Sequence, residues 1–118
     1  MMIKRKFSGN RLAEFVTYNG VAYLSGQVPT TTEEDIVKQT EEVLAKIDAL
    51  LEEAGSSKEN MLSAQIWIKN MDQDFAKFNE VWEAWIGNNE PPARAAVEAN
   101  MARPSVLVEI MVTAAMTF

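Results

Sequence analysis

One acidic residue, Glu109, stands alone among apolar residues near the end of the sequence. It follows Val106-Leu107-Val108 and precedes Ile110-Met111-Val112. A carboxylate buried in such a strand is costly unless it is paired, hydrogen-bonded or protonated. Desolvation raises the pKa of a carboxyl group, which suits a general acid or base. Glu109 is therefore a candidate catalytic residue. The alternatives are a structural ion-pair partner, or a strand whose Glu109 side faces water.

A basic residue, Arg94, is the second candidate. After Lys77 the sequence contains no lysine and only two arginines, Arg94 and Arg103. Alanines flank Arg94 on both sides and leave its guanidinium room for a planar anion, whose geometry the guanidinium fork matches bidentately. The alternative is an arginine that only neutralises Glu109 or Glu98.

Two weaker candidates accompany this pair. Ser25 and Gly26 end a predicted strand and offer a hydroxyl group and exposed amides, although Ser-Gly is also common in turns. Asn79 lies off the strongest apolar stripe of a predicted helix, where an asparagine is usually just solvated.

The composition excludes several kinds of chemistry. The sequence has no histidine and no cysteine, which excludes a Ser-His-Asp triad, a thiolate nucleophile and sites that ligate metal through either residue. It contains no glycine-rich phosphate loop and no metal-ligand spacing, so we expect neither a cofactor nor a bound metal. Acid–base chemistry must then come from carboxylates, lysines, tyrosines, backbone groups or water.

The length and composition predict one soluble globular domain over residues 1–118. Hydrophobic residues make up 47% and charged residues 24% of the chain. The net charge of −6 disfavours binding to a nucleic-acid backbone. An apolar run of about 18 residues is absent, and no apolar stretch follows the charges at the N-terminus. We therefore expect no membrane association, no signal peptide and a cytoplasmic location.

These candidates must be positioned by an alternation of strands and helices. Asn19-Gly20 between two β-rich segments predicts a hairpin. The predicted strands are an edge strand at 3–8, strands at 14–18, 21–25, 62–69 and 93–99, and an interior strand at 106–116. The first predicted helix follows residue 29, is capped at Thr31 or Thr32 and is ended by Gly55, and a short turn at 57–60 comes after it. The second predicted helix is opened by Asp72 or Asp74 and closed at 87–89.

Both predicted helices are amphipathic, which indicates an α+β sandwich with two helices packed on one face of a sheet. The opposite, helix-free face of the sheet must also pack against something. Residues 93–99 are mostly small. Residues 106–116 are apolar at both odd and even positions, which point to opposite faces of a sheet. This pattern predicts that a second subunit covers the helix-free face.

Four segments together resemble the Rid/YjgF family over nearly the whole chain. They are Asn19-Gly20 with residues 23–29 (Tyr-Leu-Ser-Gly-Gln-Val-Pro), residues 74–79 (Asp-Phe-Ala with Asn79), residues 92–97 (Pro-Ala-Arg-Ala-Ala-Val) and residues 108–110 (Val-Glu-Ile). Each segment alone is weakly specific. Their order and spacing together are specific.

The resemblance implies a chorismate-mutase-like α+β fold, a homotrimer and clefts between subunits. It also implies cofactor-free hydrolysis of 2-imino acids, such as 2-iminobutanoate and 2-iminopropanoate, to 2-oxo acids and ammonia. The family's carboxylate-binding arginine falls on Arg94, and its water-associated acid falls on Glu109. The substrate-binding serine, glycine and asparagine fall on Ser25, Gly26 and Asn79.

Two positions depart from the pattern of the resembled family. Leu12 stands where a tyrosine is usual, and Ala96 stands where a cysteine is usual. The tyrosine contributes to the pocket wall, so this chain resembles a divergent branch with a reduced or redirected activity. A non-catalytic trimeric binder of small carboxylates is the alternative function. A ribonuclease activity, attached to some relatives, is disfavoured by the acidic composition.

Overall fold

The predicted turn at Asn19-Gly20 is present in the computed structural model, which describes residues 2–7 and 9–117. Asn19 has a φ of 56° and Gly20 a φ of 81°. Both values lie in the left-handed region that asparagine and glycine adopt most readily. The turn joins strand β2 (Ala13–Tyr18) to strand β3 (Val21–Leu24), and the two strands pair antiparallel. The predicted hairpin is thus confirmed.

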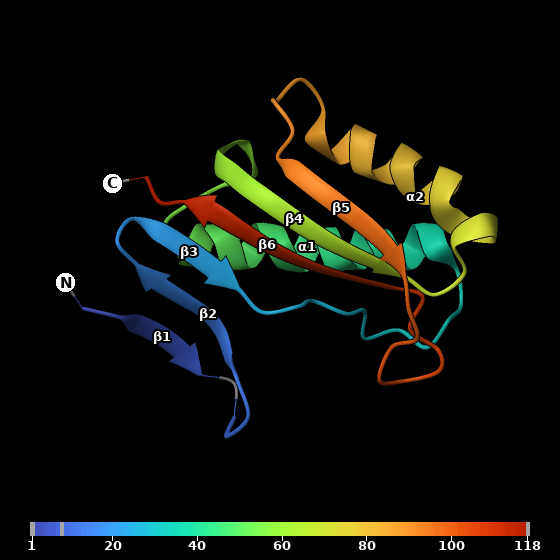
Figure 1. Ribbon diagram of the computed structural model, residues 1–118, viewed down its shortest axis with the longest axis horizontal. Helices are drawn as coiled ribbons and strands as arrows, with labels where there is room; N and C mark the ends of the chain where they lie inside the picture. The colour runs from blue at the N-terminus through green and yellow to red at the C-terminus, as the bar shows by residue number, and fades with distance from the viewer. Residues whose placement is uncertain (1, 8, 118) are drawn as a thin grey trace.

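Within the described residues the sheet has six strands in the order β1-β2-β3-β6-β4-β5 (Figure 1). The remaining strands are β1 (Lys4–Phe7), β4 (Met61–Ile68), β5 (Ala93–Glu98) and β6 (Val108–Ala115). β4 and β5 are parallel and the other pairs are antiparallel, so the sheet is mixed. The predicted edge position of β1 and interior position of β6 are confirmed. Position 8, part of the first predicted strand, lies outside the described residues.

Helix α1 (Ile36–Glu53) begins later than the predicted caps, Thr31 and Thr32, which were wrong. Its N-cap is Asp35, whose Oδ1 accepts a hydrogen bond of 3.1 Å from a backbone amide three residues on. Aspartate caps a helix at least as well as threonine. The acidic residues at 33–35 consequently precede the helix instead of occupying its first turn.

Glu42 explains why the segment before α1 is not helical. The backbone amides of Thr30 and Thr31 both donate to its carboxylate, which holds this segment along the side of the helix. The Thr30 bond is the main cause that lowers the pKa of Glu42 to about 2. A carboxyl group with a lowered folded-state pKa stabilises the fold above its ordinary pKa, and that stability is lost as the pH falls toward 2.

We expect Glu42→Gln to lower the free energy of unfolding by about 1 kcal/mol at neutral pH, because solvent partly screens this carboxylate. The loss should shrink to a small part of this value near pH 2, where about half of the wild-type carboxyl groups are themselves protonated. Urea denaturation at the two pH values measures both effects. Glu52→Gln, at an exposed position of the same helix, should change neither value. A loss that is equal at both pH values would contradict this assignment.

Helix α2 (Met71–Ile86) begins one residue before Asp72, so neither Asp72 nor Asp74 opens it. Its N-cap residue makes no side-chain hydrogen bond to the helix. The carboxylate of Glu98, at the end of β5, instead accepts a bond of 2.9 Å from the Met71 amide. This bond ties the start of α2 to an edge strand, which is why sequence-local capping rules misplaced the helix start.

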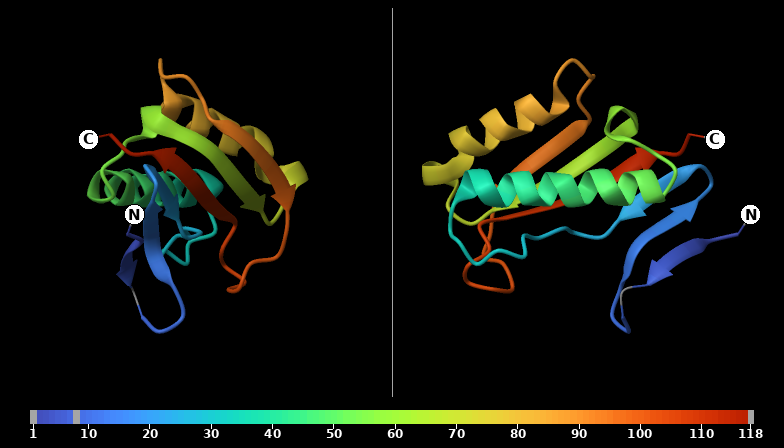
Figure 2. Two further views of the ribbon diagram at one scale, coloured as in Figure 1. Left: turned by 60° about the vertical axis from the view of Figure 1, so that its left-hand side comes forward. Right: turned by 180° about the vertical axis from the view of Figure 1, so that it is seen from behind.

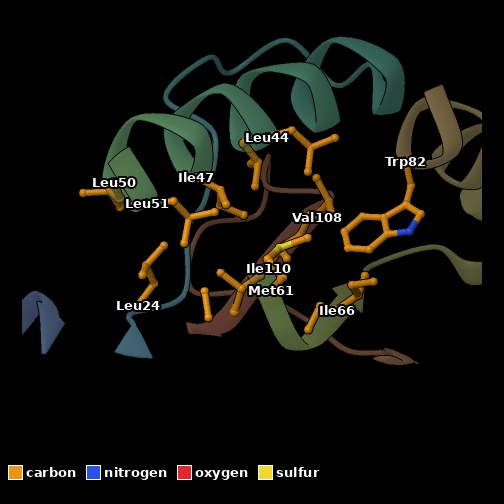
Figure 3. Close-up of a cluster of buried hydrophobic side chains, with 14 of the residues drawn as sticks. Leu24, Leu44, Ile47, Leu50, Leu51, Met61, Ile66, Trp82, Val108 and Ile110 are labelled. Atoms are coloured by element: carbon orange, nitrogen blue, oxygen red, sulfur yellow. The ribbon is translucent and has the colours of Figure 1, made fainter. Parts of the chain in front are cut away.

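Both helices pack their apolar sides against one face of the sheet, which confirms the predicted α+β architecture (Figures 2 and 3). No helix in the described ranges combines the length and apolar character needed to cross a membrane. Buried residues of the helices that form this core are Ile36, Val43, Leu44, Ile47, Leu50, Leu51, Phe78, Trp82 and Ile86. They meet strand residues that include Leu24, Ile66, Ile68, Val108, Ile110 and Val112.

Gln39 is a buried polar residue within the apolar side of α1. Its Nε2 donates to the backbone carbonyls of Glu33 (2.9 Å) and Ser105 (2.8 Å). Its Oε1 accepts a bond of 2.8 Å from the Leu107 amide. The side chain thus satisfies three backbone groups and joins α1 to the loop that leads into β6.

We expect Gln39→Leu to lower the free energy of unfolding by about 3 kcal/mol, because three backbone groups lose their partners. Urea denaturation measures this loss. Gln73→Leu, an exposed position on α2, is the matched control and should change the value by less than about 0.5 kcal/mol. Similar losses in the two variants would contradict the role assigned to Gln39.

Candidate active site

Arg94 projects from β5 onto an aromatic shelf on α2. Its guanidinium carbon lies 5.8 Å from the ring centroid of Phe75, 5.9 Å from that of Phe78 and 5.5 Å from that of Trp82. These three residues recur along one side of the helix, and their rings stack on one another in sequence. Cation–π attraction to this shelf fixes the guanidinium at an exposed edge of the sheet.

Asn79 completes the placement of Arg94. Its Oδ1 accepts a hydrogen bond of 2.7 Å from Nη2 of Arg94, so Asn79 is not merely a solvated surface residue. In the described part of the chain Arg94 forms no ion pair with Glu98 or Glu109. Neutralisation of either acid within one chain therefore does not explain this arginine. Its remaining N–H donors are available to an anion.

Glu109 lies on β6 opposite Trp67 of β4 and is half-buried. Burial raises the pKa of its carboxyl group. Its carboxylate packs directly against the backbone of Gly26, and a Cβ atom at that position would collide with Oε2 of Glu109. Any residue other than glycine at position 26 would therefore displace this carboxylate.

The segment after β3 brings the serine and the glycine to Glu109. Gln27 bridges Ile110 through two backbone bonds, of 2.8 and 3.1 Å, so this segment runs beside β6. The Ser25 hydroxyl donates to the Glu14 carbonyl at 3.2 Å, and it accepts a bond of 3.2 Å from Nε2 of Gln27. The Gly26 amide donates to no acceptor within residues 2–7 and 9–117, so it is free to bind a ligand.

One chain holds the two halves of the predicted site apart. Arg94 lies on the helix side of the sheet, as its contacts with α2 show. Along β6 the neighbours Val108 and Ile110 are buried under the helices, so Glu109 points to the opposite side. β4 also separates the two strands, which places them roughly 10 Å apart. The structure thus groups Arg94 with Asn79, and Glu109 with Ser25 and Gly26.

The open face, defined as the side of the sheet away from α1 and α2, carries exposed apolar side chains. Tyr23, Val97 and Met111 are each between 42% and 47% exposed on it. A concavity of about 380 Å³ lies over the middle of this face, lined by Tyr23, Ser63, Gln65, Ala93, Ala95 and Met111. The second subunit predicted for this face stays a prediction.

The two positions that depart from the resembled family lie in different surroundings. Leu12 is exposed and lines a concavity of about 690 Å³ beside Arg5, Phe7 and Arg11. Ala96 lies two residues after Arg94 on β5 and packs against the core. Within the described ranges no group of three or more acidic side chains is arranged to hold a metal ion.

The aromatic shelf is the part of the site that sequence reasoning missed. Phe75, Phe78 and Trp82 follow the helical period, and that period predicted only a buried face of α2. Arg94 reaches this shelf because β5 pairs in parallel with β4, a register that places Arg94 beside Ala64 and under α2. A parallel pairing cannot be read from a single sequence.

Comparison with known proteins gives consistent matches. The family model described as Endoribonuclease L-PSP matches residues 3–116. A RutC family protein of Haemophilus influenzae is 44% identical over 115 residues, which cover 97% of this chain and 98% of that protein. The crystal structure of a YjgF-family protein from Neisseria meningitidis has a TM-score of 0.94 at 43% identity, with 100% of this chain and 98% of that one covered. A Rid-family structure from Yersinia pestis has a TM-score of 0.87 at 32% identity, with 92% and 90% covered.

Proposed function

The chain belongs to the Rid/YjgF family, and from this premise we propose that it is a hydrolytic deaminase of small 2-imino acids. The proposed substrates include 2-iminobutanoate and 2-iminopropanoate, and the products are 2-oxo acids and ammonia. The observation that carries the proposal is the Arg94 guanidinium. It is fixed by three aromatic rings and Asn79, while its other donors are open to a substrate carboxylate.

The site is proposed to form between two copies of the chain. Arg94 and Glu109 lie on opposite faces of one sheet, so one copy cannot present both groups to a small substrate. We assign Arg94 and Asn79 to one subunit, and Ser25, Gly26 and Glu109 to its neighbour. The apolar side chains of the open face support such an assembly, and a homotrimer is the proposed state.

In the proposed reaction, Arg94 holds the carboxylate of a protonated imino acid. Glu109 of the partner subunit removes a proton from water as the water oxygen bonds to the imine carbon and the C=N electrons move to nitrogen. The tetrahedral carbon then carries a hydroxyl and an amino group. Glu109 of the partner subunit returns its proton to that nitrogen, and the C–N bond breaks to release ammonia. The departing ammonia takes the proton of the hydroxyl group, which becomes the carbonyl of the 2-oxo acid. The products are a 2-oxo acid and ammonium, and one water is consumed.

Two local features suit these roles. Partial burial raises the pKa of Glu109, which makes the carboxylate a stronger base for the attack on the imine. The open Gly26 amide lies beside that carboxylate and can donate to the tetrahedral intermediate. The Ser25 hydroxyl, with bonds on both sides, is assigned to hold the segment that carries Gly26 in place.

An assay that generates 2-iminobutanoate in situ and follows the imine remaining for a nucleophilic trap tests the proposal. The protein should remove the imine faster than spontaneous hydrolysis does. Light scattering should give about three times the chain mass of 13.2 kDa. Spontaneous rates combined with saturable binding of 2-oxobutanoate would favour a carboxylate binder instead. A mass near 13.2 kDa would contradict the intersubunit site.

A further inference from the structure

A groove lies between α1 and α2. Both helices face the viewer in the right-hand view of Figure 2. The groove consists of two hollows of about 490 and 530 Å³ that share Val37, Glu41 and Glu80. We call this feature the interhelical groove. It lies on the helix side of the sheet, away from the open face.

The interhelical groove has an apolar floor at one end. That floor is formed by Val37, Leu44, Ala45, Val81, Ala84 and Trp85. The Trp85 indole donates a hydrogen bond of 2.9 Å to Oδ2 of Asp48 and so links the two helices across the groove. The indole and both helix backbones are thereby held in place, which gives a partner a preformed surface to pack against.

The lining of the groove is strongly acidic. Lys38 and Lys77 are its two basic residues, and Lys38 already pairs with Glu33 at 3.0 Å. Six acidic residues line it: Glu34, Asp35, Glu41, Asp48, Asp74 and Glu80. The excess of negative charge around an apolar floor is complementary to a partner that is both cationic and apolar.

Asp74 is the feature that singles out a binding position within this groove. It is only 4% exposed, and its Oδ2 has no hydrogen-bond partner among the described residues. No ion pair in the described ranges includes it. Burial raises the pKa of its carboxyl group, the charge of Lys77 opposes this shift and that of Asp35 adds to it. A cation supplied from outside would compensate this buried charge.

We propose that the interhelical groove binds a cationic amphipathic helix of another protein. The apolar side of that helix packs on the floor beside Trp85, and one of its lysine or arginine side chains pairs with Asp74. The mode is that of a helix laid in a groove between two helices, with acidic residues on the rim facing the basic side of the partner.

The experiment uses a fluorescent synthetic peptide of about 18 residues, built from leucine and lysine at helical spacing. Fluorescence anisotropy measures its binding to the full chain at low and at physiological ionic strength. The wild type should bind it, more weakly at the higher ionic strength. A peptide with glutamate in place of every lysine should not bind.

Three variants locate the bound peptide. Asp74→Asn should weaken binding about tenfold, because a buried ion pair is lost. Asp72→Asn, two residues away on the same helix but outside the groove lining, should stay within about twofold. Ala45→Lys, at an exposed position on the floor, should weaken binding at least as much as Asp74→Asn and guards against a folding defect in that variant.

Five outcomes would overturn the proposal, and the first four concern binding. They are absence of binding by the lysine peptide, equal affinity of Asp72→Asn and Asp74→Asn, binding that Ala45→Lys leaves unchanged, and equal binding of the glutamate peptide. If Ala45→Lys lowers the mass of the protein in light scattering, the groove holds a second copy of the chain instead, which also overturns it.

Discussion

Arg94→Ala is expected to lower kcat/KM for the hydrolysis of 2-iminobutanoate at least a hundredfold. The guanidinium is the proposed clamp for the substrate carboxylate, and loss of orientation at a reacting carbon is costly even when the chemistry is unchanged. The coupled imine assay measures this loss. Because Arg94 is exposed and lies at a sheet edge, the variant should keep the thermal unfolding midpoint of the wild type within a few degrees.

Two further variants make the result specific. Arg94→Lys keeps the positive charge but loses the planar fork and its bond to Asn79, so it should recover only a small part of the rate. Arg103→Ala removes the other arginine of the C-terminal half, which donates to the Pro29 carbonyl, and should leave the rate within about threefold. Equal rates for wild type and Arg94→Ala would refute the proposed role of Arg94.

The sequence predicted most of the local structure because the signals for it are local. The Asn19-Gly20 turn, for example, depends on neighbouring residues only. A predicted helix start was wrong where a residue distant in sequence accepts a hydrogen bond from a backbone amide of the first turn, as Glu98 does for α2. Gln39 was missed for the same reason, since its three partners belong to segments that only the fold brings together.

The candidate site was predicted as a set of residues but not as an arrangement. Glu109 and Arg94 were identified from their contrast with apolar and small neighbours. Strand parity gives only relative sides within one strand, so it did not reveal that the two side chains leave the sheet on opposite faces. That separation follows from the pairing of β4 with both β5 and β6.

Glu109→Gln is expected to lower kcat at least a hundredfold, because an amide cannot take a proton from the attacking water. The affinity for 2-oxobutanoate, a product that needs no base, should change by less than about threefold. Stopped-flow or coupled assays give kcat, and calorimetry gives the affinity. A non-catalytic binder would keep its affinity in this variant and have no rate to lose.

The raised pKa of Glu109 determines the direction in which activity and stability change with pH. A general base must be ionised, so wild-type kcat/KM should fall as the pH drops through the raised pKa of Glu109. The contribution of Glu109 to the stability of the fold should change with pH in the opposite direction. Because burial raises this pKa, the folded state binds the proton more tightly, and the contribution of Glu109 to stability declines as pH rises from its ordinary value near 4.5 to the raised one. Glu109→Gln should thus be no less stable than the wild type at neutral pH, so that a lost rate cannot be blamed on unfolding.

Mixing the two inactive proteins separates a site shared between subunits from a site within one. If each site takes Arg94 from one subunit and Glu109 from its neighbour, then Arg94→Ala and Glu109→Gln subunits that are unfolded and refolded together will form some intact sites. For equal amounts and random assembly, about one site in four combines an intact Arg94 with an intact Glu109, so activity should return to roughly a quarter of the wild-type value. Each variant refolded alone should stay inactive. If the mixture is as inactive as its components, Arg94 and Glu109 do not act together across a subunit boundary. They cannot act together within one subunit either, because they lie on opposite faces of the sheet. That outcome would therefore refute the proposed chemistry.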